Sequence, residues 1–158
     1  MYDISNEYKD YLRKFDSRVS LKESRKFYGI LVTSNDIDYY IPFTSKVNKK
    51  TNSKLTLTVK DSKNNVIAKL LINNMIPVNE KDSLVVDIEK EKFKTYFNSE
   101  IQYLRKKKVK NELIKKVENV FNILNDDKHK DYIFFRKLCC DFNLLETKCK
   151  EWNLKKGK

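Results

Sequence analysis

The spacing of apolar residues in this chain changes once, near Glu89, and this change limits the folds open to it. Before Glu89, apolar and β-branched residues form short runs or alternate with polar ones, as in Lys54–Lys60 (KLTLTVK), which is typical of β-strands. After Glu89 they recur every three or four residues, which is typical of helices. We therefore predict an α+β fold, with a small, strongly bent antiparallel sheet or partly open barrel and packed helices.

The first half of the chain is expected to hold one helix and several short strands. Ser5 precedes apolar residues at helical spacing, which predicts a helix over residues 6–16 with Ser5 as its N-cap. Turn residues at 34–36 separate two β-rich runs, so we predict a hairpin of strands 27–33 and 37–43. A short strand at Tyr2 and further strands over 54–60, 66–72, 74–78 and 84–87 complete the predicted sheet.

The second half is expected to be helical, over residues 93–104, 109–124 and 130–140 and in a last helix from Asn143. Asn143 with Glu146 three residues later resembles a capping box. With 158 residues, the chain has the usual size of one domain, and we predict a single domain over 1–158.

The net charge points to a polyanionic partner. The chain has 34 Lys and Arg against 22 Asp and Glu, a formal charge of +12, and such a surface attracts nucleic acid by releasing counterions. The alternative is a chain that is merely rich in lysine, as in an AT-rich genome. A solvated helix end is likewise the alternative for the cluster at 105–108. The candidate RNA-binding residues are Lys49, Lys50, Lys54, Arg105, Lys106, Lys107, Lys108 and Arg136.

Several kinds of site have no support in the sequence. There is no nucleotide-binding glycine loop and no cysteine–histidine cluster, so we expect neither a metal nor another cofactor. Cys139, Cys140 and Cys149 lack metal-ligand spacing, and the first two are expected as small buried apolar residues. His129 is expected on the surface. No signal peptide or long apolar run is present, which favours a cytoplasmic protein without membrane contact.

One short segment carries candidate chemistry. Thr44, Ser45 and Lys46 follow the second hairpin strand and place two hydroxyls beside an ammonium group. Such groups at a strand end can grip a phosphate and stabilise charge that builds on it. An ordinary polar loop is the alternative at this level of evidence.

Several segments, in chain order, resemble the ToxN/AbiQ family of type III toxin–antitoxin toxins. The opening resembles the family's first strand and helix, and the hairpin resembles its two strands that end in a Thr-Ser phosphate site. The segments are Tyr2–Ser5 with Tyr8, Tyr11, Leu12, Phe15 and Asp16; Tyr28–Ile30; Tyr39–Lys46; Leu71–Val78; and Cys140–Lys148. They span almost the whole chain.

This resemblance implies a compact, barrel-like fold similar to the Kid/MazF toxins. It also implies a metal-independent endoribonuclease that cleaves single-stranded, adenine-rich mRNA. In the implied reaction, the ribose 2′-hydroxyl attacks the adjacent phosphate and leaves a 2′,3′-cyclic phosphate.

The resemblance assigns Tyr8, Thr44, Ser45 and Lys46 to the active site. The family's proline between the serine and the lysine is missing here. A further catalytic cation is implied before the first hairpin strand, where Arg25 and Lys26 are the alternatives. Arginine at that position would clamp a phosphate but would be a poor proton donor.

The implied partner is a pseudoknot antitoxin RNA, made of repeats that the toxin itself cuts, in a closed protein–RNA assembly that serves in phage defence by abortive infection. Two other functions compete with this interpretation. A non-catalytic RNA- or DNA-binding module would need the same positive surface, and a gyrase inhibitor could be built on the same barrel.

Overall fold

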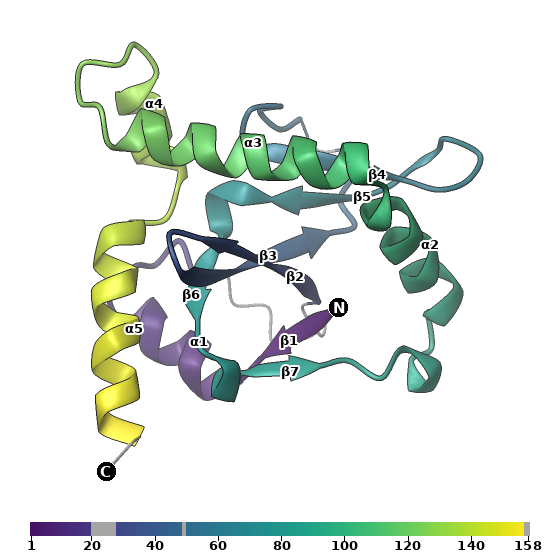
Figure 1. Cartoon of the computed structure of the whole chain (residues 1–158), viewed down its shortest axis with the longest axis horizontal. Helices are drawn as coiled ribbons and strands as arrows, with labels where there is room; N and C mark the ends of the chain where they lie inside the picture. Colours follow the sequence, from purple (N-terminus) through teal and green to yellow (C-terminus); the bar gives the residue numbers. More distant parts are fainter. Residues whose placement is uncertain (20–27, 49, 157–158) are drawn as a thin grey trace.

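The computed structural model of this chain describes residues 1–19, 28–48 and 50–156, and Figure 1 shows helices arranged around a bent sheet. The strands are β1 (Tyr2–Ile4), β2 (Gly29–Ser34), β3 (Ile37–Thr44), β4 (Thr56–Lys60), β5 (Val66–Leu71), β6 (Ile76–Val78) and β7 (Ser83–Val85). The α-helices are α1 (Asn6–Arg13), α2 (Lys94–Arg105), α3 (Lys107–Leu124), α4 (Tyr132–Leu138) and α5 (Phe142–Lys156). Three short 3₁₀ turns are η1 (Ile72–Asn74), η2 (Glu80–Asp82) and η3 (Ile88–Lys90).

Strand β3 is the centre of the sheet. The strands follow the order β4-β5-β3-β2-β1-β7, with every pair antiparallel, and β6 also pairs with β3. β6 pairs with β3 at residues 38–40 and β5 pairs with it at 43–44, so two short strands share β3 at successive positions. Among the described strands, β4 and β7 form the two edges, so the sheet does not close into a barrel. The predicted α+β fold with a bent antiparallel sheet is confirmed.

The predicted hairpin is also confirmed, and its turn has a local cause. Asn35 and Asp36 have positive φ angles of 50° and 60°, which suit a tight two-residue turn between strands of right-handed twist. At the other end of the hairpin, a Cβ added to Gly29 would lie 2.4 Å from the Ile41 carbonyl oxygen and from the Tyr40 ring. Glycine at position 29 therefore allows β2 to run directly beside β3.

Helix α3 packs with one apolar face in the core. α3 buries Val109, Leu113, Val117, Val120 and Ile123, whose spacing of three or four residues forms a single stripe. In Figure 1, α3 lies across the top beside β4 and β5, and α5 lies along the left side next to α1 and β6.

Two helix starts test the capping predictions. The Tyr8 amide donates to Ser5 Oγ at 3.3 Å, so Ser5 caps α1 as predicted, although α1 ends at Arg13 rather than 16. The predicted cap of the last helix, Asn143, is wrong. α5 begins one residue earlier, and the Leu144 amide donates to Asp141 Oδ1 at 3.3 Å. Glu146 accepts a hydrogen bond from the Tyr39 hydroxyl, so its carboxylate makes a tertiary contact and does not take part in a capping box.

Cys139, Cys140 and Cys149 are buried and unbonded to one another, which confirms the first two as small core residues. Burial raises the pKa of the Cys139 and Cys140 thiols to about 12. Within the described ranges, no helix has the length and apolarity needed to cross a bilayer. Over the same residues, no group of three or more His, Cys, Asp or Glu side chains is placed to hold a metal ion.

Candidate functional site

The segment Thr44–Lys46 forms a tight turn where β3 ends. Thr44 Oγ1 accepts a hydrogen bond from the Lys46 amide at 3.2 Å, and the Val47 amide donates to the Ser45 carbonyl at 2.9 Å. Thr44 is half-buried, whereas Ser45 and Lys46 are exposed. The turn thus presents two hydroxyls and an ammonium group at one place on the surface, a composition suited to binding a phosphate.

A second cation lies beside Thr44 through the sheet register. Lys69 on β5 pairs directly with Thr44 on β3 and with Thr58 on β4, so these three side chains lie on one face of the sheet. The Lys69 ammonium donates to Thr51 Oγ1 at 3.2 Å. Residue 51 belongs to the loop that starts at Ser45, so Lys69 connects the sheet to this loop. Lys69 is not among the residues predicted from the sequence, because strand register is a long-range property.

The loop that begins with this turn is described over residues 45–48 and 50–55, and its far end is attached to the helical layer. Lys116 Nζ on α3 donates to the Ser53 carbonyl oxygen at 2.5 Å. Lys54 Nζ forms an ion pair with Asp131 Oδ2 at 2.6 Å, just before α4. Both contacts hold the loop against α3 and α4.

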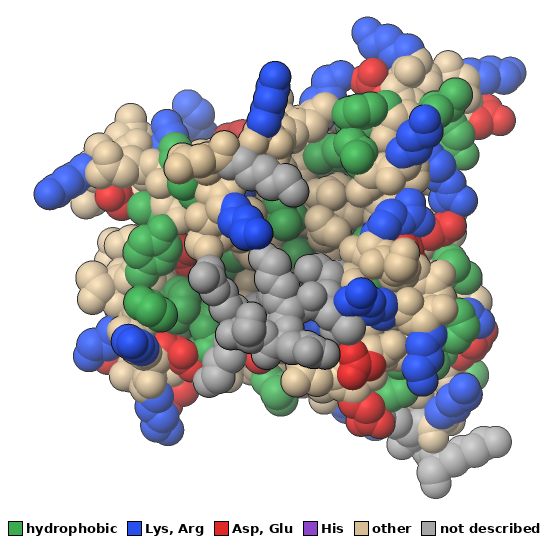
Figure 2. All heavy atoms as spheres, turned by 180° about the vertical axis from the view of Figure 1, so that it is seen from behind, with side chains coloured by type: hydrophobic (Ala, Val, Ile, Leu, Met, Phe, Trp, Pro, Cys, Tyr) green, Lys and Arg blue, Asp and Glu red, His purple; other side chains and the backbone are tan. Residues whose placement is uncertain are grey.

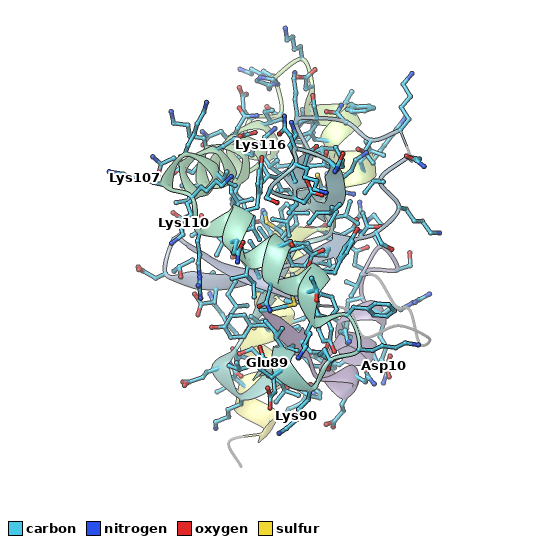
Figure 3. The ribbon with its side chains drawn as sticks, turned by 90° about the vertical axis from the view of Figure 1, so that its right-hand side faces the viewer. Asp10, Glu89, Lys90, Lys107, Lys110 and Lys116 are labelled. Atoms are coloured by element: carbon cyan, nitrogen blue, oxygen red, sulfur yellow. The ribbon has the colours of Figure 1, made fainter. Side chains whose placement is uncertain are left out.

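A basic groove of about 770 Å³ lies between this loop and α3. It contains five lysines and one glutamate, so its field is positive. The lining residues are Ser53, Lys54, Lys107, Lys108, Asn111, Glu112, Lys115, Lys116 and Asn119. Figure 3 looks almost along α3; Lys107 extends away from the molecule, whereas Lys116 lies closer to its body. Ammonium and amide groups along one groove can bind successive phosphates of a nucleic-acid strand.

Lys54, Lys107 and Lys108 of this groove were predicted from the sequence, whereas the other groove residues of α3 were not. The signal was available, since Lys107, Asn111, Lys115 and Asn119 follow one another at intervals of four residues and so share a helix face. The cluster at 105–108 was interpreted as a run of charge and not as one end of a stripe along a helix. The spacing of four residues was therefore not recognised.

The other candidate RNA-binding residues lie elsewhere. Lys106 Nζ lies 5.2 Å from the centre of the Tyr103 ring, and Arg136 forms a 2.9 Å ion pair with Asp141. Burial lowers the pKa of the Met1 amino terminus, and the nearby positive charge of Arg105 lowers it further. Lys50 is exposed. Arg25, Lys26 and Lys49 lie outside the described residues.

The structure does not bring Tyr8 to the Thr44–Lys46 turn. Its side chain has 0% exposure, and its hydroxyl donates to the Pro77 carbonyl at 2.7 Å. Pro77 pairs with Tyr39, five residues before Thr44 on β3, or roughly 16 Å along an extended strand. Burial is the largest of the effects that raise the pKa of Tyr8 well above its usual range. The resemblance assigns Tyr8 to the active site, but this burial and the bond to Pro77 favour a structural role, because a fully buried hydroxyl is not presented to RNA.

Basic side chains also occupy the face opposite that of Figure 1. Figure 2 shows Lys and Arg side chains spread over this face, both at its outline and nearer its middle, with fewer acidic ones between them. The positive charge is therefore not confined to the groove, and the groove is distinguished by its shape and by its connection to the turn.

Comparison with known proteins gives consistent similarities. The profile of a family described as "Toxin ToxN, type III toxin-antitoxin system" matches residues 1–150. Endoribonuclease ToxN of Bacillus thuringiensis subsp. kurstaki is 37% identical over 161 residues, covering 96% of this chain and 82% of that protein. Endoribonuclease AbiQ of Lactococcus lactis subsp. lactis is 30% identical over 163 residues, covering 93% of this chain and 85% of that protein.

Solved structures agree with these sequence similarities. A type III toxin structure, from work on selective toxin inhibition by a non-coding RNA pseudoknot, is 33% identical, with a TM-score of 0.84 over 96% of both chains. The structure of AbiQ, described as a lactococcal anti-phage endoribonuclease of the type III toxin–antitoxin system, is 27% identical, with a TM-score of 0.77 over 96% of both chains.

Proposed function

Because this chain belongs to the ToxN family of type III toxin–antitoxin endoribonucleases, we propose that it cuts single-stranded, adenine-rich mRNA at the Thr44–Lys46 turn. The observation that carries this proposal is the group formed at the end of β3 by the half-buried Thr44 hydroxyl, the exposed Ser45 hydroxyl and the exposed Lys46 ammonium, which one loop joins to a lysine-lined groove. The relatives at 37% and 30% identity are named endoribonucleases, which supports the reaction class.

The proposed reaction is a transesterification within the RNA. The ribose 2′-oxygen attacks the adjacent phosphorus and loses its proton to a base, while the bond from phosphorus to the 5′-oxygen breaks and that oxygen gains a proton. The products are a 2′,3′-cyclic phosphate and a free 5′-hydroxyl. The nucleophile belongs to the substrate, so the protein's contribution is to orient the phosphate and stabilise the charge that builds on it.

In this proposal, the Thr44 and Ser45 hydroxyls and the Lys46 ammonium bind the scissile phosphate, and the second catalytic cation is Arg25 or Lys26. The basic groove binds the RNA on one side of the cut through Lys54, Lys107 and Lys108. Lys115 and Lys116 extend this contact along α3. Lys49, Lys50, Arg105, Lys106 and Arg136 remain proposed RNA contacts outside the groove lining. Tyr8 has a structural role.

The proposed inhibitor is an RNA antitoxin folded as a pseudoknot, cut from a repeated precursor by the toxin itself. The solved toxin at 33% identity comes from work on inhibition by an RNA pseudoknot, which supports an RNA partner of this kind. A structured RNA is recognised mainly by its shape and phosphates, which suits a groove lined with lysine. We propose that protein and RNA form a closed assembly.

The test uses purified protein and an adenine-rich RNA in the presence of EDTA. We expect fragments that end in a 2′,3′-cyclic phosphate, and no cut where the nucleotide before the scissile bond is 2′-deoxy. Intact RNA under all conditions would instead support a non-catalytic nucleic-acid-binding module, and blocked DNA supercoiling without RNA fragments would support a gyrase inhibitor.

Ser45→Ala separates catalysis from binding. We expect its cleavage rate to fall by about 100-fold, because one donor to the transition-state charge is lost. Its folding stability and its affinity for RNA should stay close to those of the wild type, since Ser45 is exposed. Wild-type cleavage by Ser45→Ala would remove this hydroxyl from the mechanism.

A further inference from the structure

We propose that Lys69 is a positioning residue of the cleavage site, acting through Thr51 on the loop that begins with Ser45 and Lys46. This inference rests on the proposed function of the Thr44–Lys46 turn and adds a residue that neither the sequence pattern nor the comparisons assign. Lys69 is the residue that the sheet register places opposite Thr44.

The sheet register places Lys69 at the site. Thr44 and Lys69 are direct partners on antiparallel strands, where side chains on the same face have Cβ atoms about 5 Å apart. On the opposite face of β5, Ala68 and Leu70 are buried in the core at 1% and 0% exposure. Strand alternation therefore directs Lys69 to the face that carries Thr44, not into the core.

The side chain of Lys69 then reaches the loop. Its ammonium donates to Thr51 Oγ1 at 3.2 Å, and Thr51 is part of a short network at the loop's end. Thr51 Oγ1 lies 3.5 Å from Thr56 Oγ1, which in turn donates to the Asn52 carbonyl at 3.0 Å. Lys69 is thus joined to a structured part of the loop and can hold it over the end of β3.

Support through the loop would help to fix the positions of the side chains that follow β3. Thr44 Oγ1 accepts from an amide two residues away, and Ser45 and Lys46 are exposed. Groups that bind a transition state must be held to within about half an ångström, and supporting contacts normally provide this precision. Half-buried Lys69 supplies a rigid anchor on the sheet, and its charge adds to the positive field at the phosphate.

The experiment measures kcat and KM for cleavage of one RNA, together with urea unfolding. In Lys69→Met we expect kcat to fall roughly 10- to 100-fold, the loss typical of a displaced catalytic group, with KM changed less than about threefold. Lys69→Arg should recover most of the rate, since it keeps a charged donor. Lys60→Met, which removes a half-buried lysine from neighbouring β4, is the matched control and should leave both constants near wild type.

A double-mutant cycle tests the route through the loop. Thr51→Val alone should lower kcat, and Lys69→Met/Thr51→Val should lose no more than Lys69→Met, because both changes break one bond. Losses that multiply would overturn the proposal, as would wild-type kcat in Lys69→Met or equal losses in Lys69→Met and Lys60→Met. If Lys69→Met unfolds, the kcat of Thr51→Val is compared with that of Lys69→Arg/Thr51→Val. The two values should be equal, because a lysine or an arginine at position 69 has no acceptor once the Thr51 hydroxyl is removed. An inactive wild-type protein would overturn the proposed function itself.

Discussion

At the scale of single residues, Glu100 on α2 should make stability depend on pH. It is buried at 4% exposure, and burial raises its pKa to about 7 from an ordinary value near 4.5. The folded state therefore opposes ionisation, and stability falls as pH rises from the lower value through the higher one. At about pH 8, Glu100→Gln should be more stable than wild type by up to roughly 3 kcal/mol, and the two should be nearly equal at about pH 4, below the ordinary pKa of the carboxyl.

Urea unfolding at the two pH values measures this difference. Glu118→Gln removes an exposed carboxylate from neighbouring α3 and is the matched control, with the same stability relative to wild type at both pH values. A Glu100→Gln protein that is destabilised equally at both pH values would show that the carboxyl group makes specific contacts in its charged form.

Tyr8 offers a second prediction at this scale, with an outcome opposite to that of Ser45. Tyr8→Phe keeps the buried ring but removes the donor to the Pro77 carbonyl. We expect a loss of about 1–2 kcal/mol in unfolding free energy, because a buried acceptor is left unpaired. The kcat of the folded variant should stay near wild type. A large fall in kcat without loss of stability would return Tyr8 to the reacting groups.

At the scale of elements, Asp141 connects three segments. Its Oδ1 caps α5, its Oδ2 pairs with Arg136 at 2.9 Å, and its amide donates to Asp16 Oδ2 at 2.6 Å. We expect Asp141→Ala to cost about 1 kcal/mol or more and to lower Tm by roughly 2–4 °C. Asn143 lies two residues after Asp141 and is exposed, so Asn143→Ala should change Tm little. Thermal unfolding followed by circular dichroism compares them, and the reverse order would restore Asn143 as the cap.

At the scale of the whole molecule, charge should control the affinity for RNA. The chain has a net charge of +12, and five lysines line the groove. If each neutralises one phosphate of a single strand, log K should fall with log salt concentration with a slope of about −3.5. Binding of the inactive Ser45→Ala protein to RNA at several salt concentrations measures this slope. An affinity that does not change with salt would contradict capture by charge.

Replacing Lys107 and Lys115 together by Met should make the slope less steep by about one to two. Lys63 and Lys81 are exposed and lie outside the groove lining, so replacing them together by Met removes the same charge, is the matched control and should change the slope less.

Local interactions explain what could be predicted from the sequence. The α+β class, the hairpin and the Ser5 cap depend on residues at most a few positions apart, whose periodicity and turn chemistry are visible in the chain. The Thr44–Lys46 turn could be located for the same reason, since its hydroxyls and ammonium are consecutive.

The tertiary structure alone decided which distant residues meet. Thr44 faces Lys69 because β3 exchanges partners from β6 to β5, and no local pattern encodes that register. Tyr8 is buried because α5 and β6 cover α1, as its contacts with Trp152 and Pro77 show. Asp141 displaced Asn143 as a cap because packing set where α5 begins. Periodicity specifies which face of an element is buried, whereas the packing of all elements determines what that face meets.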